Sequence, residues 1–127
     1  MITELARQAL KDFIEDNFAA YNVGSGGDSV NPNATTLDAP INVSHQTSGL
    51  SISTSGISSI DFTISLNASS YVGEVIREVG IFNSASITIG GTTYAAGAIM
   101  LIRVPFDGIG PITASDTIEI VVSVDVV

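Results

Sequence analysis

Two stretches of the chain alternate strictly between apolar and polar residues, and this pattern constrains the fold more than any other feature. Alternation with a period of two places every second side chain on the same face of a β-strand. In the first stretch, the polar positions are Asp61, Thr63, Ser65 and Asn67, and the apolar positions are Ile60, Phe62, Ile64 and Leu66. In the second stretch, the apolar positions are Ile118, Ile120, Val122, Val124 and Val126. Both stretches predict strands with one buried face.

Other segments add shorter strands. Residues 85–95 carry Gly90 and Gly91 between arms rich in β-formers, which predicts a hairpin. Residues 98–106 predict an apolar strand that Pro105 ends, and weaker strands are expected over 41–48 and 50–55. Since no helical pattern separates these strands, they predict a mainly β fold, an antiparallel β-sandwich.

The N-terminal segment has a different period. Over residues 2–19, apolar side chains recur at spacings of three and four, which predicts one amphipathic helix with Thr3 as its N-cap. We therefore divide the chain into a helix over 1–20, a loop rich in Gly and Asn over 21–34, and a β-sandwich over 35–127. The helix is expected to cap or flank the sandwich.

Composition excludes several classes of protein. The chain has 127 residues, is 45% hydrophobic and carries a formal net charge of -9, with no cysteine. Such acidity argues against binding nucleic acid through its phosphates, and no apolar run is long enough to span a bilayer. The excess of acid also suggests a halophilic host, because salt would screen the repulsion between these charges.

The sequence offers no catalytic constellation. His45 is the only histidine, and it lies in a polar stretch without a nucleophile motif, so we interpret it as a solvated strand residue. In the loop over 21–34, Asp28, Asn31 and Asn33 lack the spacing of a calcium loop, and no Gly-Lys-Ser/Thr follows the glycines. We expect no enzyme activity, no metal and no cofactor.

One pair of charges stands inside an apolar segment. Arg77 and Glu78 interrupt the strand EVIREVGIF, whose two faces are both apolar, so the strand should be covered on both sides. The expected faces are 76, 78, 80 and 82 on one side and 75, 77, 79 and 81 on the other. A buried charge requires a partner. Arg103, in another apolar strand, is the expected partner of Glu78, so Arg77, Glu78 and Arg103 are the candidate members of a structural ion pair. The alternative is that Arg77 and Glu78 both reach solvent at a sheet edge.

The order of these motifs resembles a known family. The segments YNVGSGGDSVNPNATTLDAPI (21–41), IREVGIFN (76–83) and LIRVPF (101–106), followed by an alternating last strand, resemble small tail fibre or tail-associated structural proteins of tailed phages and prophages. The resemblance implies a non-enzymatic virion protein of the tail, baseplate or fibre-attachment region. It also implies assembly into a homo-oligomer and with other virion proteins, without a nucleic acid or membrane partner.

Two alternatives stay open. One is a capsid surface protein, such as a turret or decoration protein. The other is a carbohydrate-binding module, for which Tyr21, Tyr71 and Tyr94 are the tyrosines available for contact with sugars. For assembly, the candidate interface residues lie on the helix and in the glycine-rich segment: Leu5, Phe13, Tyr21, Gly24, Gly26 and Gly27.

Overall fold

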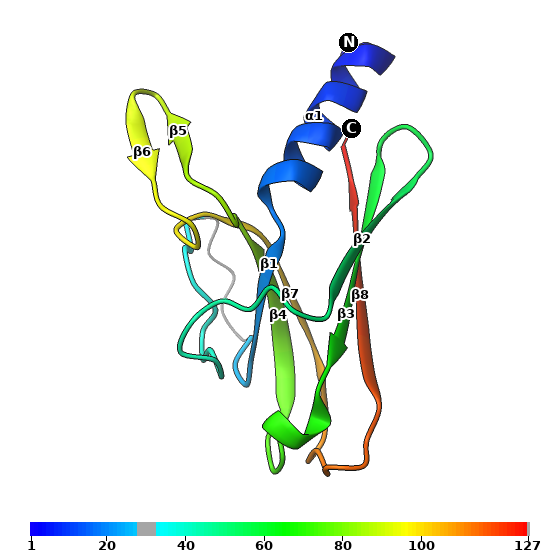
Figure 1. The fold of residues 1–127 in the computed structure, drawn as a ribbon, viewed down its shortest axis with the longest axis vertical. Helices are drawn as coiled ribbons and strands as arrows, with labels where there is room; N and C mark the ends of the chain where they lie inside the picture. Colours follow the sequence, from blue (N-terminus) through cyan, green and yellow to red (C-terminus); the bar gives the residue numbers. More distant parts are fainter. Residues whose placement is uncertain (28–32, 127) are drawn as a thin grey trace.

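A computed structural model describes residues 1–27 and 33–126. The protein is mainly β, with one N-terminal helix and two three-stranded antiparallel sheets packed face to face (Figure 1). The first sheet has the order β1-β4-β7, and its strands are β1 (Ala20–Gly24), β4 (Ile76–Phe82) and β7 (Met100–Ile109). The second has the order β2-β3-β8, and its strands are β2 (Leu50–Ser55), β3 (Ser59–Leu66) and β8 (Ile118–Asp125). The predicted β-sandwich is confirmed.

The remaining elements are short. A hairpin of β5 (Ile87–Ile89) and β6 (Thr92–Tyr94) turns at the predicted glycine pair, and η1 (Ala68–Ser70) follows β3. Helix α1 (Glu4–Asn17) begins as predicted at Thr3, whose hydroxyl accepts a hydrogen bond from the Ala6 N–H at 3.3 Å. Of the helices within the described residues, none is long and apolar enough to cross a membrane.

The alternating strands bury the faces that the sequence predicts. In β3, Ile60, Phe62 and Ile64 are fully buried, while the side chains between them are partly or fully exposed. The partner strand β8 shows the same pattern and runs antiparallel to β3 in unbroken register. Because both sheets contribute such a face, the main core lies between them.

Strand β4 is the centre of the first sheet and is covered on both sides, but its faces differ from those predicted. Ile76 lies in the main core with Val79 and Ile81, and not on the side of Glu78. The change of faces occurs where the register is irregular: the step from Ile76 to Glu78 on β4 matches a longer step from Ile109 to Pro105 on β7. Such irregularities bend a strand and change the direction of its side chains.

Three other predictions were wrong. The strand expected to end at Pro105 continues to Ile109, because β7 still pairs with β4 beyond the proline. The loop predicted over 21–34 begins as a strand, because Tyr21–Gly24 belongs to β1 and pairs with β4; residues 28–32 of that loop lie outside the described residues. The strand predicted over 41–48 does not form. That segment makes only a single bridge, Tyr21 to Gln46, and covers the outer edge of β1.

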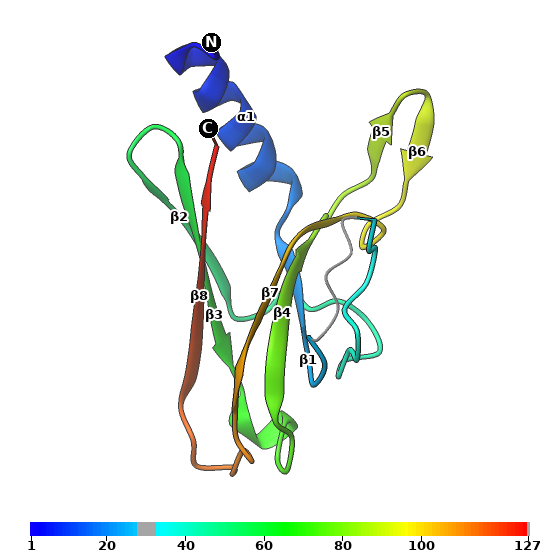
Figure 2. The ribbon, with the colours of Figure 1, turned by 180° about the vertical axis from the view of Figure 1, so that it is seen from behind.

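Helix α1 is held to the sandwich mainly at its C-terminal end. The Ser84 N–H donates to the Asn17 carbonyl at 2.8 Å, and Phe18 is buried just beyond the helix. From this attachment the helix extends past one end of the sheets (Figures 1 and 2). The β5–β6 hairpin and the turn between β2 and β3 project at the same end.

Candidate functional site

Glu78 is the most unusual side chain of the core, because it is a fully buried carboxylate. Its oxygens accept three backbone N–H bonds, each 2.9 Å long, from Gly26, Asp38 and Ala39. All three donors come from the segment that follows β1, more than thirty-five residues away in sequence. A buried charge is tolerated when its oxygens are hydrogen-bonded in this way.

The glycines of the motif GSGG make room for this carboxylate. A Cβ atom at Gly24 would lie 2.5 Å from Glu78 Oε2 and 2.7 Å from the Ala39 carbonyl oxygen, and one at Gly26 would lie 2.8 Å from the same Oε2. Any side chain at these positions would displace the carboxylate or the backbone that binds it. The glycine-rich segment therefore acts within the chain, as a cradle for Glu78.

Arg103 lies beside Glu78, as the sequence predicts, but it has a second and closer partner. Arg103 Nη1 is 3.8 Å from Glu78 Oε1 and 2.9 Å from Asp38 Oδ2, and the latter contact is an ion pair without hydrogen-bond geometry. Arg77 was predicted as a member of this cluster. It is exposed and, among the ion pairs of the described residues, it takes part in none.

Asp38 and the three backbone donors were not predicted. Peptide N–H groups have no sequence signature of their own, and Asp38 looks like an ordinary loop carboxylate. The sequence did offer one signal for a binding loop. The segments GSGG and TLDAP have no clear secondary-structure pattern, and the acid Glu78 lies in an apolar strand and needs hydrogen-bond donors. Loops that bring consecutive N–H groups to one point are a common way to bind an anionic group.

The last polar residue of the motif IREVGIFN is also a structural residue. Asn83 is fully buried, and its side chain donates to the carbonyls of Ala85 and Ala95 at 2.9 and 3.0 Å and accepts from the Ile99 N–H at 2.9 Å. These bonds hold the two ends of the β5–β6 hairpin together. The polar residues of the motif that lie inside the protein thus maintain the fold.

Helix α1 shows the opposite arrangement, since its apolar face points to solvent. None of its residues is buried, and Leu5 is 78% exposed and Phe13 47% exposed. The polar side of the helix faces the sandwich: the Lys11 side chain is only 13% exposed, and Arg7 Nε and Glu15 Oε1 are buried. Only Ile14, near the C-terminal end, packs against the main core. The expected helix is confirmed, but its stripe does not cover the sandwich.

Exposed apolar residues concentrate at the end of the molecule where this helix lies. Among residues 1–27 and 33–126, eight of the eleven exposed large hydrophobic side chains belong to α1 and its N-terminus, the β2–β3 turn and the β5–β6 hairpin. We call this surface the apolar end; its members are Met1, Ile2, Leu5, Leu10, Phe13, Ile57, Ile89 and Tyr94. Large exposed apolar groups gathered in one region indicate an interaction surface.

The other predicted interface residues do not present apolar side chains to solvent. Tyr21 is 3% exposed and Gly24 is buried, so neither is accessible to a partner. Gly26 and Gly27 are partly exposed, and their N–H groups bind the carboxylates of Glu78 and Asp38. Of the predicted interface residues, Leu5 and Phe13 are the ones that present apolar side chains to solvent.

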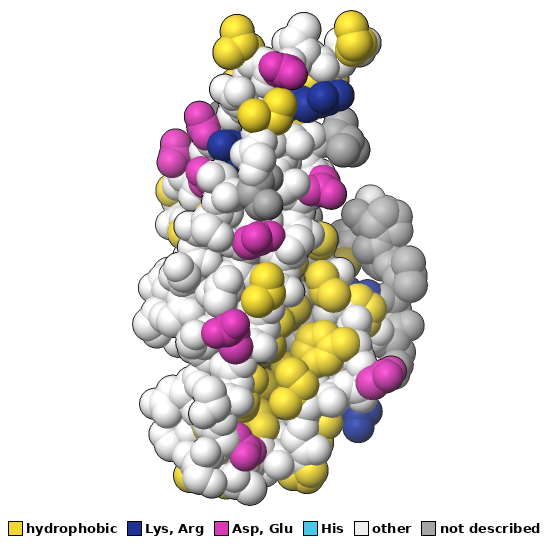
Figure 3. Space-filling view, turned by 90° about the vertical axis from the view of Figure 1, so that its right-hand side faces the viewer, with side chains coloured by type: hydrophobic (Ala, Val, Ile, Leu, Met, Phe, Trp, Pro, Cys, Tyr) yellow, Lys and Arg dark blue, Asp and Glu magenta, His cyan; other side chains and the backbone are white. Residues whose placement is uncertain are grey.

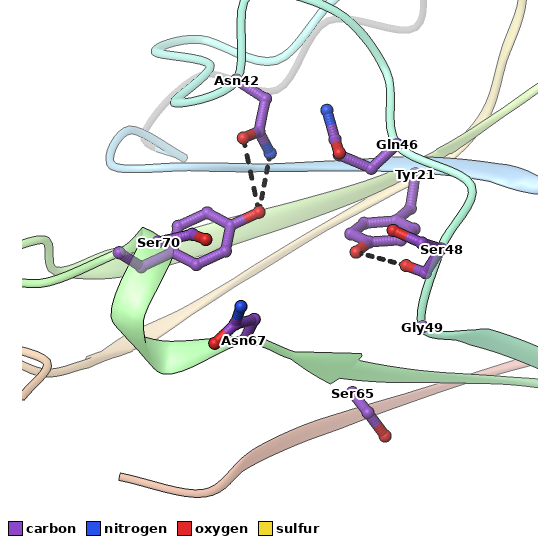
Figure 4. Close-up of a pocket in the computed structure, with 9 residues that line it drawn as sticks. Tyr21, Asn42, Gln46, Ser48, Gly49, Ser65, Asn67 and Ser70 are labelled. Carbon is purple, nitrogen blue, oxygen red and sulfur yellow. Dashed lines mark hydrogen bonds between the residues drawn. The ribbon is translucent and has the colours of Figure 1, made fainter. Parts of the chain in front are cut away.

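A polar cavity of about 450 Å³ opens beside β1 (Figure 4). None of the residues that line it is charged, although 17 of the residues in the chain are. The Tyr21 hydroxyl donates to the Ser48 carbonyl at 2.9 Å, and the Asn42 amide donates to the Tyr71 hydroxyl at 2.9 Å. The lining residues are Tyr21, Asn42, Gln46, Ser48, Gly49, Ser65, Asn67, Ser70 and Tyr71.

Two titratable groups have altered acidity near this region. Burial, together with the nearby Tyr71, raises the pKa of Tyr21. Burial lowers the pKa of His45, whose ring stacks on Phe82 with 3.9 Å between ring centroids. His45 therefore packs against the protein and is not the solvated strand residue that the sequence suggested.

Within the described residues, no group of three or more His, Cys, Asp or Glu side chains lies close enough to hold a metal ion. Asp28 and Asn31, which were considered as calcium ligands, lie outside those residues. No protein-family model matches the chain, and no curated protein matches it.

Proposed function

We propose that this protein is a non-enzymatic structural protein of a virus particle, located in the tail, baseplate or fibre-attachment region. It assembles there with copies of itself and with other virion proteins. The apolar end is the observation that carries the proposal, and the resemblance of the motifs over 21–41 and 76–83 to tail-associated proteins supplies the setting.

The orientation of α1 supports assembly more directly than its composition does. An amphipathic helix in a domain that functions alone turns its apolar stripe inward. Here the sandwich contacts the polar side, and the stripe with Leu5 and Phe13 stays in water. Exposing this stripe is unfavourable by about 25 cal/mol for each Å² of apolar surface, so contact with another protein would stabilise it.

A matched pair of double variants tests the assembly role. Leu5→Ser with Phe13→Ser removes apolar side chains from the apolar end, and Val43→Ser with Val72→Ser removes side chains elsewhere that are at least as exposed. We expect only the first variant to lose incorporation into purified particles, or co-purification with virion proteins. Equal incorporation of both variants would contradict the proposed role of the apolar end.

The place in the particle is tested by imaging. Gold-labelled antibody against this protein should mark the tail or baseplate in negative stain. Label at the capsid vertices or faces would instead support the capsid surface alternative. Particles that carry no label while the protein is abundant in the lysate would argue against any virion role.

A second candidate function, carbohydrate binding, is favoured by the cavity beside β1. Its wall offers amide and hydroxyl groups and no charge, which suits a neutral polyhydroxyl ligand. A glycan array followed by calorimetry would test this candidate, with Ser70→Trp as the variant that fills the cavity and Ser53→Trp as an exposed control. Absence of any glycan hit would remove it.

A further inference from the structure

The outer edge of β8 is the least protected strand edge of the sandwich. Each three-stranded sheet has two edges, which belong to β1, β7, β2 and β8. The edge of β1 is covered by the segment that contains Pro40 and Gln46. The edge strand β7 contains Pro105 and an irregular register, both of which hinder pairing with another strand.

Of the two edges in the second sheet, β8 offers the longer one. β2 has six residues and β8 has eight, with no proline, glycine or lysine and no bulge. Its outward face carries Val121, which is 54% exposed, at the centre of the strand. A long and regular edge with an exposed apolar centre is a template for another strand.

We propose that β8 pairs antiparallel with β8 of a second copy, about a two-fold axis at Val121. The two second sheets then form one continuous sheet of six strands. In this register Val121 lies opposite Val121 of the other copy, and Glu119 lies opposite Ser123. Asp125 lies opposite Thr117. The proposal goes beyond the proposed virion function, because it concerns a different surface from the apolar end.

The charges of β8 favour this register over the one centred on Val122. In antiparallel pairing, opposite residues share a face, so a shift by one residue would set core side chains against solvent-facing ones. A shift by two residues to the pairing centred on Val122 would set Glu119 opposite Asp125, which is unfavourable for like charges. The pairing centred on Val121 avoids both, and it also sets Ile120 opposite Val122 on the core side.

Acids opposite hydroxyl residues already occur inside the chain, between β3 and β8. In the pairing of β3 with β8, Asp61 lies opposite Ser123, and the hydroxyl of Ser123 donates to Asp61 Oδ1 at 2.7 Å. Ser59 is likewise hydrogen-bonded to Asp125 across the two strands. Each acid of this face thus has a hydroxyl residue opposite it. The proposed pairing repeats that arrangement across the axis.

Pairing at β8 would also cover the apolar side chains of the neighbouring strand β7. β7 and β8 are the edge strands on the same side of the sandwich (Figure 2), and several apolar side chains of β7 between them, among them Leu101, Val104 and Phe106, are only partly buried. Figure 3, which views the molecule from the side of the second sheet, shows hydrophobic side chains in a band along this face. A second copy at β8 brings its own β7 toward this band.

Cysteine cross-linking tests the register, because the chain contains no cysteine of its own. A residue paired with itself across an antiparallel contact has its two Cα atoms about 4.5–5.5 Å apart, within the range of a disulfide. In Val121→Cys, diamide should therefore oxidise the two thiols to an intermolecular disulfide. Ser123→Cys is the control on the same strand and face, since in this register its two copies are about 13 Å apart.

All variants are made in the Leu5→Ser, Phe13→Ser background, so that contact through the apolar end does not contribute, and in about 0.5 M salt to screen the acidic repulsion. Selective cross-linking of Val121→Cys supports the pairing. Equal yields for the two cysteine variants, or a higher yield for Ser123→Cys, would overturn it. These results are independent of particle incorporation, which tests the proposed function.

Light scattering provides the second measurement. The chain with Val121 in the same background should be dimeric, and Val121→Lys should dimerise at least about tenfold more weakly, because two like charges would meet on the axis. Circular dichroism confirms that Val121→Lys is folded, as expected for a half-exposed site. A folded monomer with Val121 at every accessible concentration, or a dimer unaffected by Val121→Lys, would overturn the proposal.

Discussion

The Glu78 cradle and helix α1 each reverse the ordinary distribution of polar and apolar groups, but only the cradle compensates for it within the chain. Glu78 is a charge in the core, and three N–H groups and Arg103 surround it. The helix has an apolar stripe in solvent, and the sandwich contacts its other side. Glu78 has its partners inside the chain and maintains the fold, whereas the apolar stripe of α1 is the surface that we propose for contact with another molecule.

The largest effect is expected at the cradle. Glu78→Ala should lower the free energy of unfolding by about 3–5 kcal/mol, because it removes the acceptor of three backbone N–H groups and one of the two acidic partners of Arg103. Urea unfolding measures this change, with the exposed neighbour Glu74→Ala as control. A change within about 0.5 kcal/mol, which is typical of surface sites, would show that the cradle does not stabilise the fold.

A smaller loss is expected when the cradle is crowded but keeps its charge. Gly24→Ala places a methyl group 2.5 Å from Glu78 Oε2 and should cost about 1–3 kcal/mol, as overpacking of a filled interior does. Ser25→Ala, at the exposed next residue, is the matched control in the same urea experiment. Equal midpoints for the two variants would mean that the loop moves away without cost.

His45 represents an intermediate case, a titratable ring that is only partly buried. Its pKa is lowered below the ordinary value of 6.5, so the unfolded chain binds more protons and stability should fall as the pH drops through that value. The fall is small because the ring is partly exposed. Urea midpoints at about pH 8 and about pH 6, above the range of ordinary carboxylates, measure it. If His45→Gln shows the same fall, the effect comes from another group.

The smallest effect on stability is expected at the helix. Leu5→Ser with Phe13→Ser should change the free energy of unfolding by no more than about 0.5 kcal/mol for each site, since neither side chain is buried. The same variant should lose its partners, as described above. A loss of several kcal/mol would show that the stripe completes the core and would remove the contrast with the cradle.

Much of the architecture was predictable from local patterns. The alternation of apolar and polar residues over 60–66 and 118–124 indicates which face of each strand is buried. This pattern is clear because only one face of each strand packs in the core and the other meets water. The register of β4 against β7 was not predictable, since a bulge depends on how two distant strands meet. Strand β1 was missed because AYNVG is short and contains Asn and Gly, which are depleted in strands, and pairing with β4 outweighs their local preference.

The candidate sites divide in the same way. The sequence shows that Glu78 needs a partner and that Arg103 is available, because charges inside apolar strands are rare. It does not show that peptide groups near Gly26 and Asp38 would be the closest donors, since every residue except proline carries the same N–H.

By itself, the sequence determined which side chains form the two β faces and which stripe of the helix is apolar, because these depend on spacing along one segment. Only the tertiary structure decided that the stripe would face water, that a glycine-rich loop would enclose a carboxylate, and that β8 would end the second sheet with an open edge. These outcomes depend on which distant segments pack against the same surface, and the spacing of residues along one segment does not determine those contacts.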